Sequence, residues 1–211
     1  MKQEEIFQKI KETKIVPVVK LDHVEDAIPL CAALLDGGLP IAEITFRTAA
    51  AEESIRQATN EFPDMLIGAG TIINVEQAKL AIAAGAKFLV SPGFSESITK
   101  FAIANNVPIF PGISTPTEIM MALEYDLPVL KLFPAKQLGG LDIINAFGAA
   151  FPSARFMPTG GIDSNNILEH LACDKIIACG GSWMVKDTLI KDKNFSEITR
   201  LTSEAMALVT Q

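Results

Sequence analysis

The sequence of 211 residues has few of the side chains that build metal sites and disulfides. It contains three cysteines and two histidines, at no spacing that resembles a set of metal ligands. We therefore expect buried, reduced thiols, no metal and no cofactor. Unpaired thiols in odd number are typical of a cytoplasmic protein, and we predict that location.

Long apolar runs and basic clusters are also missing. No run approaches the roughly 20 apolar residues that a membrane-spanning helix needs, and the charged first 14 residues do not resemble a signal peptide. The formal net charge is −7 with no basic block, which argues against a nucleic-acid-binding surface. We therefore predict neither a membrane nor a nucleic-acid partner.

Apolar runs of a few residues recur along the chain, without a Gly/Ser-rich linker, a low-complexity segment or a break in composition. We predict one domain over residues 1–211. Segments with helical spacing lie between the runs, as expected for βαβ units and a parallel sheet. The runs number about eight, roughly 20–26 residues apart, and begin at Ile15, Ile41, Met65, Ala86, Val107, Pro128, Arg155 and Lys175.

Eight such units predict an α/β protein whose strands close into a (β/α)8 (TIM) barrel, compact and with short loops. The amphipathic segment 3–13 is expected to be an extra N-terminal helix that covers the bottom of the barrel. The alternative is an open doubly wound sheet. Such a sheet usually carries a glycine-rich nucleotide motif after its first strand, whereas VPVVKLDHVEDA contains no glycine.

The second apolar run places its polar side chains on one face. Glu43, Thr45 and Arg47 share that face with Ile41, and the opposite face is apolar. Because functional groups of barrel enzymes gather at the carboxyl ends of the strands, we expect Glu43 and Arg47 to lie inside, near the mouth.

Lys131 is the one charged residue of the sixth run, PVLKLF. Strand alternation puts it on the inward face with Val129 and Phe133. Burial disfavours a charged ammonium and favours the free amine, which is the form that condenses with a ketone to an imine. The alternative is an ion pair with Glu43 that only closes the barrel, but the position at the end of the strand favours a chemical role.

Two glycine pairs follow the last two runs, Gly160–Gly161 in PTGG and Gly180–Gly181 in CGGSW. Peptide N–H groups approach an anion closely where no Cβ intervenes. Turns after the last two strands are the usual phosphate site of barrel enzymes. Thr71 of GAGT and Pro92 of SPG are expected to reach the same mouth.

Seven motifs occur in order between about residues 15 and 190: EITFRT, GAGT, SPG, PGISTPTE, LKLFPA, MPTGG and CGGSW. Together they resemble the bacterial 2-keto-3-deoxy-6-phosphogluconate (KDPG) and 4-hydroxy-2-oxoglutarate (KHG) aldolases. The resemblance implies a class I (Schiff-base) aldolase, a carbon–carbon lyase of the Entner-Doudoroff pathway. It also implies a homotrimer, a keto-acid substrate that yields pyruvate, and no cofactor.

The same resemblance implies a role for each candidate residue. Lys131 would form the Schiff base, and Glu43 would be the general acid and base. Arg47 and Thr71 would bind the pyruvyl carboxylate, and the apolar wall would consist of Pro92 and Phe133. The phosphate or distal end would be held by Thr159, Gly160, Gly161, Gly181 and Ser182.

Two departures from the family pattern leave the preferred substrate open. Lys20 stands where many relatives carry Arg, and Lys136 stands where relatives often carry Glu, so both bear on the distal specificity. Substrates with a distal group of the phosphogluconate, galactonate or glyoxylate type all fit the same site. An isomerase or synthase acting on a sugar phosphate is the alternative function, but it gives no reason for an inward Lys131 beside Glu43. A non-catalytic phosphometabolite binder would show affinity without turnover.

Overall fold

The computed structural model describes residues 3–210, in which nine strands and ten α-helices alternate. The strands are β1 (Ile15–Val19), β2 (Ile41–Thr45), β3 (Leu66–Gly70), β4 (Leu89–Val90), β5 (Ile109–Phe110), β6 (Gly112–Ile113), β7 (Val129–Leu132), β8 (Arg155–Phe156) and β9 (Cys179–Gly181). The helices are α1 (Gln3–Thr13), α2 (Ala27–Asp36), α3 (Ala51–Glu61), α4 (Val75–Ala83), α5 (Glu96–Ala104), α6 (Pro116–Leu123), α7 (Leu141–Ala150), α8 (Ile167–Leu171), α9 (Asp187–Lys191) and α10 (Phe195–Val209), with short 3-10 helices at Val24–Asp26 and Lys136–Leu138.

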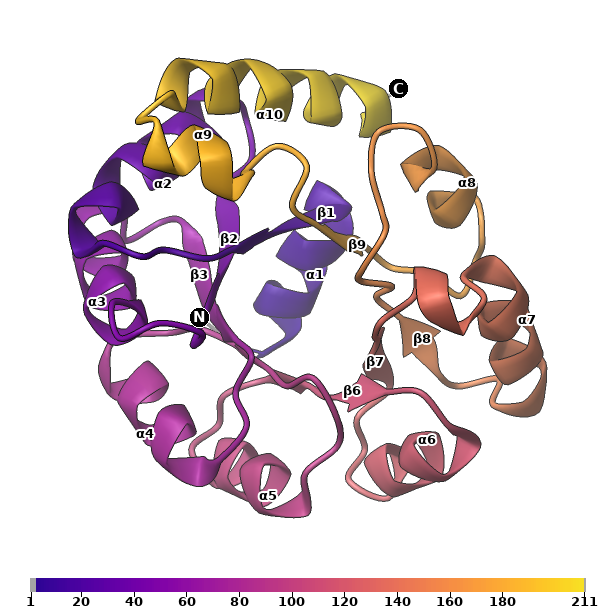
Figure 1. The fold of residues 1–211 in the computed structure, drawn as a ribbon. Coiled ribbons are helices and arrows are strands. Elements are labelled where there is room, and N and C mark those ends of the chain that lie inside the picture. Colours follow the sequence, from indigo (N-terminus) through magenta and orange to yellow (C-terminus); the bar gives the residue numbers. More distant parts are fainter. Residues whose placement is uncertain (1–2, 211) are drawn as a thin grey trace.

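The strands form two sheets in which neighbouring strands are parallel. One is a curled six-stranded sheet with the order β5-β4-β3-β2-β1-β9, and the other is a three-stranded sheet with the order β6-β7-β8. Figure 1 shows helices α2 to α8 and α10 around the outside of these strands. Every predicted apolar run contains a strand, and the run from Val107 is followed by a ninth strand, β6.

The predicted closed eight-stranded barrel is wrong, although the α/β class holds. The six-stranded sheet forms a half-barrel, and single bridges between Phe156 and Ile176 and between Thr159 and Gly180 link the three-stranded sheet to it. Pro111 separates β5 from β6 and has no N–H to donate, so the chain leaves one sheet there and enters the other. Several strands are only two residues long, which limits the ladders they can form.

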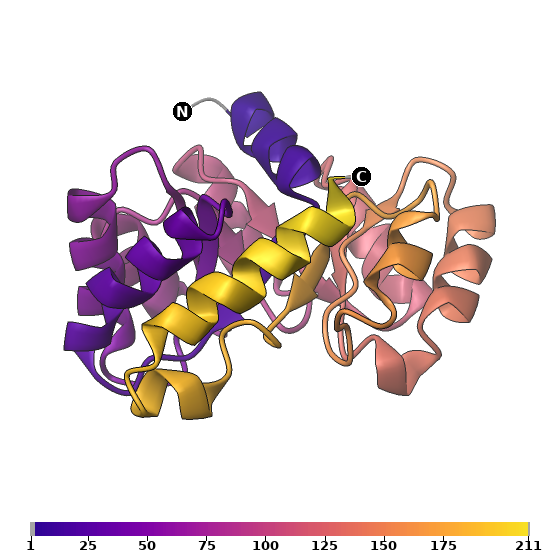
Figure 2. The same ribbon diagram turned by 90° about the horizontal axis from the view of Figure 1, so that it is seen from above.

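The predicted N-terminal helix is present as α1, over the residues expected for it. Its Ile6 and Ile10 are buried, and the ring of Phe7 meets that of Phe110 edge to face, with 5.4 Å between the centroids. Figures 1 and 2 place α1 across the end of the sheets at which β1 begins. The carboxyl ends of the strands, where functional groups are expected, lie at the opposite end. Within residues 3–210, no helix combines the length and the apolar content needed to cross a bilayer.

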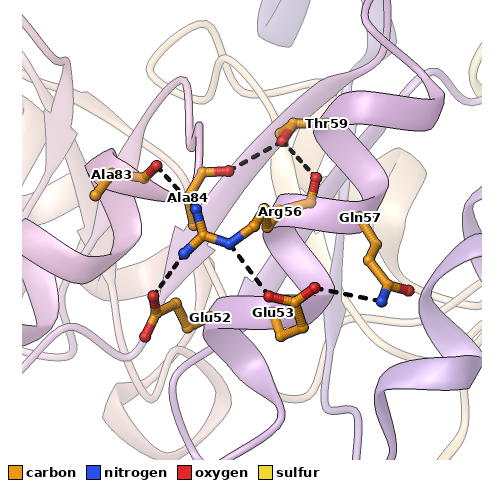
Figure 3. Close-up of polar contacts among 7 residues, drawn as sticks. All are labelled: Glu52, Glu53, Arg56, Gln57, Thr59, Ala83 and Ala84. Carbon is orange, nitrogen blue, oxygen red and sulfur yellow. Dashed lines mark hydrogen bonds and ion pairs between the residues drawn. The ribbon is translucent and has the colours of Figure 1, made fainter.

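Polar contacts on the outer layer join α3 to the end of α4 (Figure 3). Thr59 donates to the carbonyl of Ala84 at 3.0 Å and Arg56 donates to that of Ala83 at 3.4 Å, so α3 satisfies carbonyls at the carboxyl end of α4. Arg56 also pairs with Glu52 and Glu53 of its own helix. Exposed pairs of this kind contribute about 0–1 kcal/mol each, so packing rather than charge holds these helices.

The last helix, α10, lies against α2 (Figures 1 and 2). The two helices approach closely at Gly37, the residue that ends α2, and at the buried Thr202 of α10. A Cβ added to Gly37 would lie 2.5 Å from Cβ of Thr202, which is closer than two carbons can approach. The absence of a side chain at Gly37 therefore sets the distance between the helices.

Gly37→Ala is expected to destabilise the protein by about 1–3 kcal/mol, because α2 and α10 must move apart. Gly37 has φ −77°, which alanine adopts freely, and alanine is the better helix former, so a loss of stability reports the contact itself. Thermal and urea unfolding measure the change. An unchanged or higher midpoint would contradict the close packing.

Candidate active site

Glu43 and Lys131 form a buried ion pair between the two sheets. Glu43 lies in β2 and Lys131 in β7, and their Oε1 and Nζ atoms are 3.2 Å apart. Glu43 is 1% exposed and Lys131 is 5% exposed. Strand alternation points both side chains inward, and the packing of the two sheets brings together these residues, which are far apart in the sequence. At this separation a proton can pass between carboxylate and amine.

The second carboxylate oxygen of Glu43, Oε2, is buried and has no hydrogen-bond partner among residues 3–210. A buried acceptor without a donor costs roughly 1–3 kcal/mol, and more when it is charged. Such a group is retained where it serves a reaction. Glu43 therefore has one oxygen engaged with Lys131 and one that no described residue engages.

Gly70, the last residue of β3, leaves room for the Glu43 side chain. A Cβ on Gly70 would lie 2.1 Å from Oε1 of Glu43, an impossible contact. The glycine of the GAGT motif is thus required by the carboxylate on the neighbouring strand, since β2 pairs with β3.

A cavity of about 160 Å³ opens beside Lys131, and we call it the inner cavity. Six of its seven lining residues are predicted site residues, contributed by different strands and turns. The seventh is Val18 of β1. The cavity is lined by Val18, Arg47, Thr71, Pro92, Lys131, Phe133 and Thr159. Nζ of Lys131 lies 5.5 Å from the ring centroid of Phe133, so the amine has an aromatic neighbour as well as Glu43.

Arg47 is held by a hydroxyl that sequence reasoning passed over. Its Nε donates to Oγ1 of Thr45 at 3.0 Å, and Oγ1 donates its own hydrogen to the carbonyl of Val19 at 2.8 Å. The direction is fixed, because a carbonyl only accepts and Nε–H only donates. The two Nη groups of Arg47 have no partner within residues 3–210 and can face a carboxylate. Thr45 is 1% exposed, so this support is rigid.

Thr71 adopts a left-handed backbone conformation, with φ +58°. This region is unusual for a β-branched residue and costs on the order of 1–3 kcal/mol. Thr71 is half-buried and lines the inner cavity. Its strained backbone brings the hydroxyl of the GAGT motif to the mouth of the site.

A second cavity of about 170 Å³, the outer cavity, shares Val18, Arg47, Phe133 and Thr159 with the inner one. The two therefore adjoin. Its remaining lining comes from the turn after β8 and from the end of β9 with the residue that follows it, the segments expected to hold the distal end. These residues are Gly160, Gly161, Ile162, Gly180, Gly181 and Ser182.

The two glycine pairs, in the turn after β8 and at the end of β9, permit close contacts. Gly160 and Gly161 have φ +98° and +80°, which favour glycine. A Cβ on Gly180 would lie 2.3 Å from Oγ1 of Thr159, and one on Gly181 would lie 2.0 Å from the ring of Trp183. The glycine pairs thus let the turn after β8 and the end of β9 lie side by side.

Lys20 and Lys136, the two departures from the family pattern, are not part of either lining. Lys20 pairs with Asp22 at 2.7 Å and with Asp187 at 3.5 Å, and the hydrogen bond to Asp22 raises the pKa of Lys20. The lysine is therefore engaged with carboxylates. Lys136 lies beside the glycine turn, since a Cβ on Gly161 would be 2.5 Å from that of Lys136.

None of the cysteines and histidines within residues 3–210 is among the residues that line the two cavities. Cys31 and Cys179 are buried, as expected, and burial raises the pKa of both thiols to about 12. Cys173 differs from the expectation because it is only half-buried. Within the described part of the chain, no group of three or more His, Cys, Asp or Glu side chains is placed to hold a metal ion.

Residues 6–201 match the family model of the KDPG and KHG aldolases. The chain belongs to this family. The predicted family and aldolase activity are confirmed, and the alternative of an isomerase or synthase is not supported. A 2-dehydro-3-deoxy-phosphogluconate aldolase from Treponema pallidum is 45% identical over 204 residues, covering 97% of either chain.

Solved structures of aldolases have the same fold. A KDPG aldolase from Legionella pneumophila, with pyruvate captured as a covalent carbinolamine intermediate, has a TM-score of 0.91 at 37% identity and covers 94% of this chain and 97% of its own. A KDPG aldolase from Zymomonas mobilis with 3-phosphoglycerate has a TM-score of 0.89 at 33% identity, covering 97% and 96%.

Gly70→Ala is expected to displace Glu43 and to lower kcat by up to about 100-fold, because a catalytic group would move by an ångström or so. Overpacking should also reduce stability by about 1–3 kcal/mol. Gly93→Ala is the matched control, since a Cβ at Gly93 meets nothing within 4 Å. Steady-state kinetics and thermal unfolding test both variants. Wild-type kinetics in Gly70→Ala would show that Glu43 needs no such space.

Proposed function

We propose that the chain cleaves KDPG to pyruvate and glyceraldehyde 3-phosphate through a Schiff base on Lys131, and that it also accepts KHG, which yields pyruvate and glyoxylate. The observation that carries the proposal is the buried amine of Lys131, 3.2 Å from Glu43 and facing the inner cavity. The family model, which covers both aldolase types, supports both substrates.

The ion pair supplies the proton transfers of the first steps. Lys131 gives a proton to Glu43, and the free amine attacks the C2 ketone to form a carbinolamine. Glu43 then protonates the departing hydroxyl, which leaves as water and gives the iminium ion. The carbinolamine captured in the Legionella aldolase is the intermediate expected on this route.

The iminium ion accepts the electrons of the bond that breaks. The Glu43 carboxylate removes the C4 hydroxyl proton, the C3–C4 bond breaks, and the aldehyde leaves. Glu43, now protonated, gives a proton to C3 of the enamine, and water adds to the resulting iminium ion to release pyruvate and the amine. Oε2 of Glu43, which has no partner within residues 3–210, is the atom best placed to accept the hydroxyl proton.

The two cavities divide the substrate between them. Arg47 and Thr71 of the inner cavity bind the carboxylate next to the ketone, and Pro92 and Phe133 pack against the carbon chain. The distal end enters the outer cavity, where Thr159 and Ser182 offer hydroxyl donors and the turn after β8 offers peptide N–H donors. The 3-phosphoglycerate bound by the Zymomonas aldolase is consistent with a phosphate there.

Three further proposals follow from the family. The chain acts as a homotrimer, is cytoplasmic, and serves the Entner-Doudoroff pathway. We also propose that residues 1–211 make one domain. The apolar residues buried in the described part of the chain form one contiguous cluster, which supports the last proposal.

Incubation with pyruvate and borohydride is expected to leave a stable adduct on Lys131, located by mass spectrometry of peptides. Lys131→Met should abolish both the adduct and KDPG cleavage. Lys131→Arg keeps a cation beside Glu43 and should fold but stay inactive, which separates lost chemistry from lost structure. Lys136→Met, which changes an exposed lysine of the same segment, should react as the wild type does. Turnover in folded Lys131→Arg would refute the mechanism.

Thr45→Val is expected to raise KM for KDPG and KHG by about 10-fold, because Arg47 loses the acceptor that orients it. Thr45→Ser keeps the hydroxyl and should behave as the wild type does. In an Arg47→Ala background, adding Thr45→Val should change KM no further, since the two residues act as one unit. Steady-state kinetics of the four variants give the coupling. Independent effects would mean that Thr45 supports only the fold.

A further inference from the structure

The turn after β8 is held by one side chain, that of Asn166. Its Nδ2 donates to the carbonyl of Gly161 at 2.8 Å, and its Oδ1 accepts from the N–H of Asp163 at 3.0 Å. The orientation of the amide is fixed, because the carbonyl only accepts and the N–H only donates. Asn166 thus bridges the two ends of the segment Gly161–Asp163.

This segment would be loose without such a bridge. Gly160 and Gly161 have no side chains with which to pack, and glycine loses more backbone entropy on ordering than any other residue. The carbonyls before Gly161 are tied to the chain that follows β7, since Ala135 N–H donates to Thr159 at 2.8 Å and Lys136 N–H donates to Gly160 at 3.1 Å. Asn166 extends this series to the carbonyl of Gly161.

With the carbonyls of this segment held on one side, its free N–H groups remain at the outer cavity. Gly161 and Ile162 line that cavity, and their peptide N–H groups donate to no group within residues 3–210. Neighbouring backbone N–H groups form a concave binding surface for anions. Because Arg47 is the only charged residue in the lining, binding of an anion there depends on the placement of the N–H groups.

Asn166 is itself held in place. Its carbonyl accepts from the backbone N–H of His170 at 3.2 Å and lies 2.9 Å from Nδ1 of the His170 ring, which must carry the hydrogen in that contact. His170 is 7% exposed. The buried ring of His170 thus holds Asn166, and Asn166 in turn holds the turn after β8.

We propose that Asn166 is a positioning residue that sets the preference of this enzyme for phosphorylated over unphosphorylated keto acids. The inference rests on the proposed function, because it assigns the phosphate to the outer cavity. Asn166 acts by holding the carbonyl of Gly161, so that the N–H groups of Gly161 and Ile162 stay directed at one phosphate. It takes no part in the steps at Lys131.

Asn166→Ala is expected to raise KM for KDPG by about 10-fold or more, since a misplaced donor no longer bonds a charged oxygen. The values of kcat for both substrates and of KM for KHG should change by less than about 3-fold, because KHG has no phosphate. Asn165→Ala is the matched control: Asn165 is the adjacent residue, it is exposed, and its side chain makes no hydrogen bond within residues 3–210. It should leave both KM values unchanged.

Asn166→Asp is the second variant, for the case that alanine prevents folding. It keeps the acceptor for the Asp163 N–H but places an oxygen against the carbonyl of Gly161, so it should also weaken binding of KDPG. An equal loss for KDPG and KHG, or wild-type KM values in both Asn166 variants, would overturn the proposal.

Calorimetric titration with 3-phosphoglycerate separates this inference from the proposed function. Affinity should fall by about 10-fold in Asn166→Ala and stay unchanged in Asn165→Ala. If that result appears in a protein that does not cleave KDPG, the positioning role stands and the substrate assignment fails. Equal affinity in the two variants would refute the positioning role, whatever the wild-type protein cleaves.

Discussion

The buried ion pair of Glu43 and Lys131 is the interaction on which the site depends. Removing two charges from water costs several kcal/mol per ion, and only a close, fixed pair offsets that cost. The 3.2 Å between Oε1 and Nζ spans two sheets, so the packing of both sheets maintains it. The space at Gly70 is part of the same arrangement. A pair of this kind adds little net stability, but it places a proton donor and a proton acceptor in direct contact beside a cavity.

The two ends of the site rely on different forces. The inner end uses full charges, those of Lys131 and Arg47, and a rigid hydroxyl at Thr45 that orients the guanidinium. The outer end uses peptide dipoles and hydroxyls from turns rich in glycine. Lys20 does not change this division, because Asp22 and Asp187 neutralise it. In the proposed site, charge therefore selects the keto-acid group, and backbone geometry selects what lies beyond it.

Sequence alone predicted the local part of this arrangement. The alternation of Glu43 and Lys131 with apolar neighbours was enough to place both on inward faces, because a strand repeats every two residues. Closure of the barrel was predicted wrongly, since it depends on hydrogen bonds between strands remote in sequence. Pro111 divides the fifth apolar run between two sheets. The supporting bonds of Thr45 and Asn166 were missed as well: polar residues at the ends of strands and helices are common, and sequence does not reveal which carbonyl or guanidinium each one contacts.

The contrast between charges at the inner end of the site and backbone donors at the outer end limits how substrate specificity can change. In the proposed mechanism, any keto acid with a hydroxyl at C4 presents the same groups to Lys131, Glu43 and Arg47, so these residues do not distinguish one distal group from another. Discrimination has to arise in the outer cavity, from one or two contacts of a few kcal/mol at most. The contacts available there include peptide N–H groups, which no substitution removes directly, apart from proline. The range of substrates is therefore set by residues that shape the turn from behind, and it can shift while the chemistry at the lysine stays intact.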